Sequence, residues 1–169
     1  MRHAKHVIVI LVALCGFLFT TSLLAQEIEP RLNIDLTKID GTKIRMAEHF
    51  VTQYLVVDFS QLACGACREA SEQMNSNQDF QSLFQSKKCN MITLVPEGQV
   101  RRWVNWIGGA TSFVGQHSYS VTGSLTNVAE QAFNYKLPET PSFIIIDRQG
   151  QILAKPVWLP GSDAEEFCQ

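Results

Sequence analysis

The chain has 169 residues, of which 46% are apolar and 18% charged, with a formal net charge of −2. This composition is typical of a folded protein and argues against a disordered chain, a collagen-like repeat or a coiled coil. A nucleic-acid-binding surface needs clustered Lys and Arg, and the closest approach here is the pairs Lys87-Lys88 and Arg101-Arg102. We therefore expect no nucleic acid among its partners.

Residues 1–25 have the pattern of a secretory signal peptide. Arg2 and Lys5 precede an apolar run, which ends in small residues up to Ala25. A basic start, a short apolar segment and a small residue at the end are typical of such leaders. The alternative is an uncleaved anchor, because about 18–20 apolar residues can span a bilayer. Either way, we expect residues 26–169 to form one domain in the periplasm or cell envelope, membrane-anchored if the leader stays.

The predicted elements begin with two short strands and a buried one. Residues 32–36 alternate between apolar and polar side chains, and Asp40-Gly41 separates them from a second short run at 43–45. Asp-Gly between such runs is a hairpin signal. Residues 54–59 are almost continuously apolar, as in a central strand that is buried on both faces.

Helical and strand patterns alternate through the rest of the chain. Residues 110–122 are the exception, and we expect a loop with a short strand near Tyr119 there. The predicted order gives an α/β fold, a mixed central sheet with helices on both faces. The remaining predicted elements are a helix at 64–75 that restarts at Asn77 or Asp79, a strand at 90–95, helices at 99–107 and 125–135, and strands at 143–147 and 151–154.

Cys64 and Cys67 follow the buried strand and open a helix, which is where a dithiol becomes reactive. Two intervening residues let a helical turn bring the sulfur atoms within bonding distance. Unpaired N–H groups and the macrodipole at the helix start favour the thiolate of Cys64. We therefore expect Cys64 to attack a disulfide and Cys67 to resolve the mixed disulfide, with no cofactor, because the sulfurs carry both electrons.

Residues 57–68 resemble the active-site segment of the thioredoxin family, with Cys64 and Cys67 in place of the dithiol and Asp58 in place of a buried acid. Residues 140–150 are similar to the family's cis-proline strand and the hairpin that follows it. The resemblance implies a thioredoxin fold and a thiol-disulfide oxidoreductase that acts on client proteins.

Two further segments narrow this resemblance. Residues 40–50 resemble the N-terminal extension of the exported TlpA/ResA-type branch, here a β-hairpin, and residues 75–84 are similar to the C-terminal domain of the membrane reductant conductor DsbD. The resemblance implies recharging by a membrane electron donor of the DsbD type. Exported members of the family often serve cytochrome c maturation, but no residue here identifies such a client.

Asp58 has two interpretations. A carboxyl buried near Cys67 has a raised pKa and accepts the proton of the resolving thiol near neutral pH. Alternatively, Asp58 is a partly exposed residue at a strand end, with a hydrogen bond to the backbone.

Pro141 is the candidate for the family's cis-proline, with Pro138 as the rival. The resemblance places it opposite the dithiol, where the backbone of Thr140 pairs with an extended client segment. Gly65 and Ala66, between the cysteines, would contact the same client. The alternative is a trans-proline at the entry of a strand.

Two departures from the family bear on partner and direction. Ala63 stands where the family usually has Trp, which removes a flat apolar surface on which partners rest, and Ala66 stands where Pro is frequent. Neither Gly65 nor Ala66 supplies a cation to stabilise the thiolate. The reduction potential should therefore be low, which favours a reductase or isomerase-like enzyme over a primary oxidase.

The other two cysteines, Cys89 and Cys168, either form a structural disulfide or remain isolated thiols. A zinc site at the dithiol would need two more ligands, and these cysteines, His49 and His117 include no second closely spaced pair. We therefore expect no metal.

A different class of function stays open, namely a redox-inactive binding or assembly protein with the thioredoxin shape. The missing Trp at position 63 favours it, as does the helix that carries Trp103 and Trp106 beside Arg101 and Arg102. This helix is either a plain amphipathic helix or a docking surface for a partner. A peroxidase is disfavoured, because Gln61 stands where its Thr-x-x-Cys motif requires Thr.

Overall fold

A seven-stranded mixed sheet in the order β2-β1-β5-β4-β3-β6-β7 runs through the molecule. Strands β3, β4 and β5 are parallel, and the other neighbours are antiparallel. The computed structural model describes residues 28–85 and 88–169, so the predicted leader lies outside the described residues. The strands are β1 (Asp35–Thr37), β2 (Lys43–Arg45), β3 (Tyr54–Phe59), β4 (Cys89–Val95), β5 (Ser118–Val121), β6 (Ser142–Asp147) and β7 (Ile152–Ala154).

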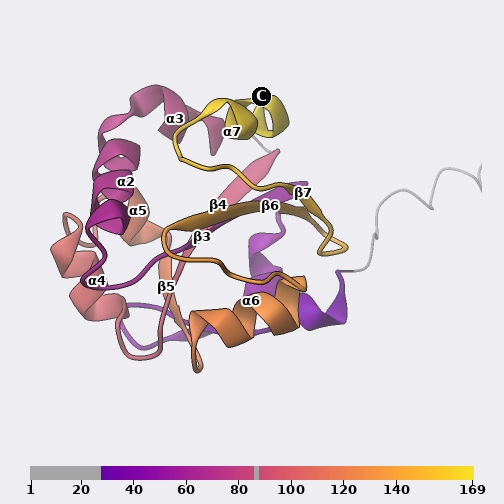
Figure 1. Cartoon of the computed structure of the whole chain (residues 1–169), viewed down its shortest axis with the longest axis horizontal. Coiled ribbons are helices and arrows are strands. Elements are labelled where there is room, and N and C mark those ends of the chain that lie inside the picture. Colours follow the sequence, from indigo (N-terminus) through magenta and orange to yellow (C-terminus); the bar gives the residue numbers. More distant parts are fainter. Residues whose placement is uncertain (1–27, 86–87) are drawn as a thin grey trace, which may run out of the picture.

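Helices cover both faces of this sheet, with α2, α3 and α7 on one face and α6 and η1 on the other (Figure 1). None of the helices that the structure describes is long and apolar enough to cross a bilayer. The helices are η1 (Pro30–Leu32), η2 (Met46–His49), α2 (Gly65–Ser76), α3 (Gln78–Leu83), α4 (Val100–Trp106), α5 (Phe113–Gln116), α6 (Leu125–Phe133) and α7 (Ser162–Cys168).

Strand β3 lies in the middle of the sheet and is buried on both faces, which explains its continuous apolar sequence. Leu55, Val57 and Phe59 pack in the core beneath α6, whereas Val56 packs in the core beneath α2. Side chains alternate along a strand, so Asp58 faces the α2 side together with Val56. The strand therefore delivers one carboxyl group into a mainly apolar core.

The predicted architecture is confirmed, including the hairpin of β1 and β2 and the mixed sheet with helices on both faces. The predicted strand at 32–36 begins late, because Pro30 opens the 3-10 helix η1 and the chain is extended only from Asp35. Within 110–122 the structure adds the short helix α5, which the sequence analysis assigned to a loop.

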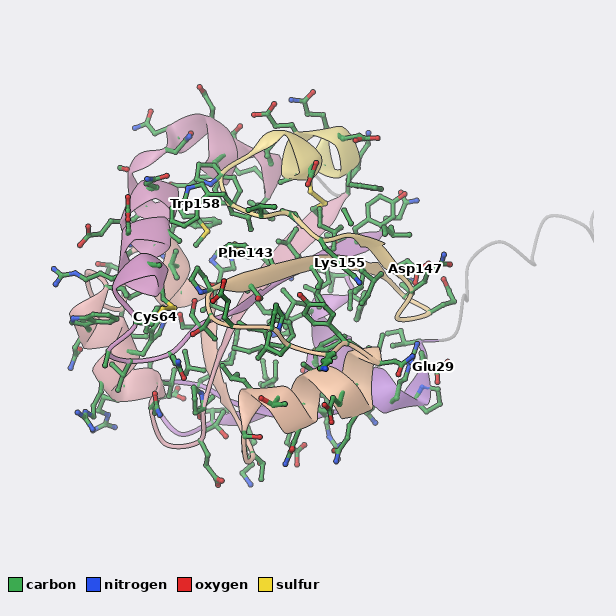
Figure 2. All side chains as sticks on the ribbon, viewed as in Figure 1. Glu29, Cys64, Phe143, Asp147, Lys155 and Trp158 are labelled. Atoms are coloured by element: carbon green, nitrogen blue, oxygen red, sulfur yellow. A yellow bond between two sulfur atoms is a disulfide. The ribbon has the colours of Figure 1, made fainter. Side chains whose placement is uncertain are left out.

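The chain after β7 returns to the α2 side of the sheet and ends in α7, a helix that is not among the predicted elements. Trp158 lies on the α2 side of the sheet (Figure 2). It anchors this segment, because its indole N–H donates to the Gln73 side chain of α2 at 2.8 Å. Phe167 of α7 packs edge-on against Tyr54 of β3, with ring centroids 5.8 Å apart. The C-terminal segment is thus part of the packed structure.

Candidate redox site

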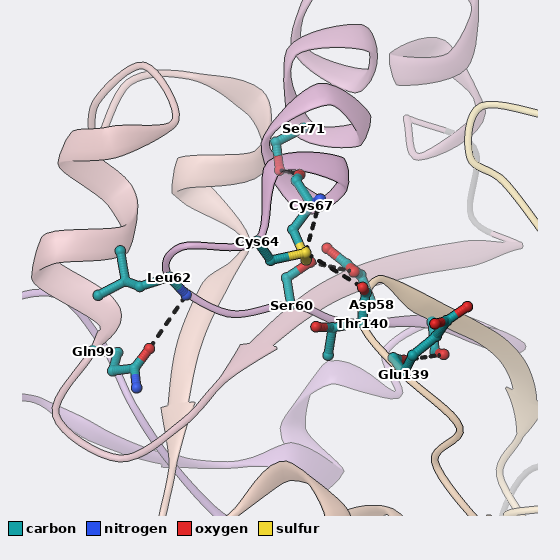
Figure 3. The surroundings of a disulfide bond; sticks show 10 residues. Asp58, Ser60, Leu62, Cys64, Cys67, Ser71, Gln99, Glu139 and Thr140 are labelled. Atoms are coloured by element: carbon teal, nitrogen blue, oxygen red, sulfur yellow. Dashed lines mark hydrogen bonds between the residues drawn. A yellow bond between two sulfur atoms is a disulfide. The ribbon is translucent and has the colours of Figure 1, made fainter.

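Cys64 and Cys67 form a disulfide at the start of α2, with their Cα atoms 5.2 Å apart (Figure 3). Cys64 is the N-cap residue of this helix, and its sulfur accepts the backbone N–H of Cys67 at 3.1 Å. Cys67 is completely buried, whereas Cys64 is half-buried. An incoming molecule can therefore reach the sulfur of Cys64 but not that of Cys67.

The backbone just before the dithiol turns sharply. Ala63 has a φ of +64°, in the left-handed region that residues other than Gly rarely adopt. Such a conformation costs on the order of 1 kcal/mol. It redirects the chain from the loop after β3 into α2 and leaves Ala63 exposed beside Cys64.

Thr140 lies opposite the dithiol, 76 residues further along the chain. Its carbonyl oxygen is 3.3 Å from the sulfur of Cys64, and the Thr140–Pro141 peptide bond is cis. Thr140 and the dithiol loop lie close together because the end of β3 at Phe59 pairs with the start of β6 at Ser142 in the sheet. Pro138 does not follow a cis bond and lines a neighbouring groove instead.

Asp58 is completely buried, which excludes the partly exposed position considered above. The hydroxyl of Ser60 donates a 2.8 Å hydrogen bond to Asp58 Oδ1, and Oδ2 has no hydrogen-bond partner among the described residues. Removal from water raises the pKa of Asp58 to about 7, although the hydroxyl groups of Ser60 and Thr93 lower it. The carboxyl can thus exchange a proton at neutral pH on the face of the sheet that Cys67 covers.

A groove of about 260 Å³ runs beside the Thr140 segment. Gln61 from the loop before the dithiol forms part of one wall, and Pro138, Glu139 and Thr140 belong to another. Gly65 and Ala66 are exposed at the first turn of α2. The predicted client-binding residues are thus accessible around the half-buried sulfur.

The other two cysteines, Cys89 and Cys168, also form a disulfide, with Cα atoms 5.2 Å apart and a sequence separation of 79. Both are completely buried, and the bond ties α7 to the first residue of β4. Among the described residues, no three His, Cys, Asp or Glu side chains are placed to hold a metal ion.

Two features of the site are not among the sequence predictions, namely Ser60 and the surroundings of Ala63. Ser60 lies two residues after Asp58, and period-two alternation in an extended chain could have placed both side chains on one face. The second omission is a hollow formed by Leu62, Ala63, Arg102 and Trp106. No sequence signal brings α4 to this loop, because the contact is tertiary.

Known proteins share the fold of this chain, although no protein-family model matches the sequence and no curated protein matches it. Among solved structures, the thioredoxin domain of a thiol-disulfide oxidoreductase from Bacteroides vulgatus is similar at 20% identity and a TM-score of 0.58, over 88% of this chain and all (100%) of that one.

Two further solved structures are similar in fold. A thiol:disulfide interchange protein from Bacteroides sp. has 19% identity and a TM-score of 0.57, over 84% of this chain and 88% of that one. A secreted Mycobacterium tuberculosis disulfide oxidoreductase, homologous to E. coli DsbE, has 12% identity and a TM-score of 0.51, over 82% and 93%. The chain therefore has the thioredoxin fold, with a closely spaced cysteine pair at the start of α2.

Proposed function

We propose that this protein is an exported thiol-disulfide oxidoreductase that exchanges disulfides with client proteins through Cys64 and Cys67. The observation that carries the proposal is the disulfide at the N-terminus of α2, with one sulfur accessible and the other buried. A reactive dithiol needs this asymmetry. The first sulfur must contact the client, and the second must be close to the first, so that it can attack the mixed disulfide.

In the reductive direction, the thiolate of Cys64 attacks one sulfur of a client disulfide. The Cys64–client bond forms, the client disulfide breaks, and one client thiolate leaves and takes a proton from water. The thiol of Cys67 then loses its proton to Asp58 and attacks the sulfur of Cys64. The second client thiolate leaves, so the client gains two electrons and the dithiol becomes the disulfide of Figure 3.

Asp58 suits the proton-accepting role because its pKa is about 7. A general base works best when its pKa is close to the working pH. Client binding is assigned to the exposed groups around Cys64, which are Gly65, Ala66 and the backbone of Thr140 beside Pro141.

The surroundings of Cys64 support the reductive direction. Its sulfur accepts one backbone N–H, from Cys67, but lies against the partly negative carbonyl oxygen of Thr140. No cationic side chain of the described residues donates a hydrogen bond to it. A weakly stabilised thiolate makes the dithiol the stronger reductant. Turnover then needs an external dithiol donor, which we assign to a membrane protein of the DsbD type.

Reduction of insulin by the mature domain tests the activity. We expect the wild type to reduce insulin disulfides and Cys64→Ser to do no better than the buffer with its reductant. Cys89→Ser is the matched control, because it removes a cysteine away from the accessible site. A wild type no faster than Cys64→Ser would leave only a thioredoxin-shaped binding protein.

Cys67→Ser in the native cell tests the direction and the clients. Without the resolving thiol, Cys64 should remain attached to its partners, which mass spectrometry would identify after non-reducing purification. We expect the wild-type dithiol to be mainly reduced and the captured set to include exported proteins and a membrane donor. A mainly oxidised dithiol that captures no donor would reverse the assigned direction.

A further inference from the structure

A hollow of about 330 Å³ lies on the other side of the dithiol loop from the Thr140 groove. Leu62, Ala63, Arg102 and Trp106 line it. Ala63 directly precedes Cys64, so the hollow adjoins the accessible sulfur. A molecule bound to Cys64 would reach it with its neighbouring residues.

Trp106 forms a fixed apolar wall of this hollow. Its ring packs against the fully buried Trp103, with centroids 5.7 Å apart. The guanidinium of Arg68 lies 5.6 Å from the ring centroid, within the range of a cation–π contact. Because these contacts already hold the indole in place, a ligand that binds against it costs the side chain little further conformational entropy.

Arg102 supplies the only charge among the residues that line the hollow. It is exposed, and it takes part in no ion pair within residues 28–85 and 88–169. Arg68, by contrast, is neutralised by Glu72, whose carboxylate is 2.8 Å from Arg68 Nε. The hollow is therefore apolar on one wall and positive on another, with a cation still available for a partner.

The groove on the opposite side of the loop has the opposite charge. Gln61 lines that groove, whereas the next two residues line the hollow, so the loop is the ridge between them. Among the described residues that line the groove, Glu139 is the only charged one. An extended segment that crosses Cys64 thus meets a carboxylate on one side and a guanidinium on the other.

We propose that the hollow of Leu62, Ala63, Arg102 and Trp106 is a client subsite that takes an acidic side chain next to the client's reactive cysteine. This inference rests on the proposed function, because it concerns the segment that Cys64 attacks. The carboxylate pairs with Arg102, and its methylene groups lie against the indole of Trp106. Such a subsite selects disulfides in acidic surroundings although the protein itself has a net charge of −2.

Disulfide-linked peptides test this subsite. Each pair of peptides is identical except for Glu or Lys next to one cysteine, in one pair before it and in the other pair after it. We expect wild-type kcat/KM to favour Glu over Lys in at least one pair. Arg102→Glu should lower that Glu/Lys ratio about tenfold, because it replaces attraction by repulsion at a partly exposed site. Any change in the reactivity of Cys64 affects both peptides equally and cancels in the ratio.

Arg101→Glu is the matched control. Arg101 is exposed on the same helix, and its substitution changes the net charge equally, but it lines a different hollow together with Lys38 and Lys43. Its Glu/Lys ratio should stay within about twofold of the wild-type value. An unchanged ratio in Arg102→Glu, or an equal fall in both variants, would overturn the subsite.

Reduction of the uncharged hydroxyethyl disulfide separates this inference from the proposed function. If the wild type reduces it faster than Cys64→Ser does, the dithiol chemistry holds and the peptide ratios alone judge the subsite. If the wild type is no faster, the proposed function fails, and the client subsite fails with it.

Discussion

Asp58 is a residue whose proposed function opposes the stability of the fold. Its pKa is about 7 in the folded protein, against an ordinary value of 3.8, because burial disfavours the charged form. Between these two pH values, the unfolded chain has lost the proton that the folded protein keeps. The contribution of Asp58 to stability must therefore fall as the pH rises from about 4 to about 7, and it remains low above that.

Asp58→Asn should raise the free energy of unfolding at pH 8 by on the order of 2–4 kcal/mol. The gain should nearly vanish at pH 4, where the carboxyl is largely protonated in both states. Urea unfolding at the two pH values measures this difference. Asp40→Asn is the control, because the backbone N–H of Thr42 lowers the pKa of this exposed carboxyl, and it should give no gain at pH 8. An equal gain of Asp58→Asn at both pH values would contradict the assigned pKa.

Ser60→Ala should raise the pKa of Asp58 further, because it removes the hydrogen bond that stabilises the carboxylate. The pH profile of disulfide reduction should then move to higher pH, and an NMR titration of the carboxyl should show the same direction. Ser71→Ala is the matched control, since this buried hydroxyl donates to the carbonyl of Cys67. If both variants moved the profile equally, Ser60 would have no special role.

At the level of single residues, the sequence identifies the reactive cysteines and the buried acid but not the residues that surround them. The spacing of Cys64 and Cys67 after a buried strand predicts the disulfide at the helix start. Asp58 is identified through the resemblance to thioredoxins, which implies a buried acid at this position. Ser60 has no such signal, since a serine after a strand is usually only a turn residue. Arg102 and Trp106 were noted as a candidate docking surface, but their position beside Ala63 depends on how α4 packs.

Among the elements, α5 shows why short helices escape prediction. Its four residues include Gly115, and glycine normally weakens a helix. The structure requires this glycine, because a Cβ atom at that position would clash with the carbonyl oxygen of Gly109. Ser112 caps the helix by accepting the N–H of Gly115 at 3.1 Å. A sequence that looks like a loop is thus a helix whose composition is dictated by close packing.

Gly115→Ala should therefore destabilise the protein by on the order of 1–3 kcal/mol, as overpacking usually does. Gly65→Ala is the control, because a Cβ atom there would contact nothing within 4 Å. That change should leave the stability unaltered or raise it slightly, since Ala favours the helix. Thermal or urea unfolding compares the two variants, and an equal loss in both would refute the packing argument.

The strand order explains why the longer elements were predictable while the site was only partly so. Period and length identify β3, α2, α6 and β6 one by one. The pairing of β3 with β6 brings the dithiol loop to Thr140, and this pairing is a property of the whole sheet. The resemblance to thioredoxins implies that Pro141 lies opposite the dithiol. Local sequence patterns do not, because they do not say which strands become neighbours.

At the scale of the whole molecule, the disulfide of Cys89 and Cys168 fastens the C-terminus to the central sheet. Loop closure over a separation of 79 residues stabilises the fold by about 4 kcal/mol. The double variant Cys89→Ser/Cys168→Ser should lose about that much free energy of unfolding. It should still reduce insulin at the wild-type rate per folded molecule. Equal stability of the two proteins in urea would show that the bond is not structural.

The two disulfides also differ in their accessibility to other molecules. Under the proposed function, the protein would also meet other copies of itself, each with a second disulfide of the same chemical kind. Cys89 and Cys168 are completely buried, so the Cys64 thiolate of a second copy could not reach their sulfur atoms. Under the proposed function, burial thus protects the disulfide of Cys89 and Cys168 from exchange, and Cys64–Cys67 is the pair that reacts with other molecules.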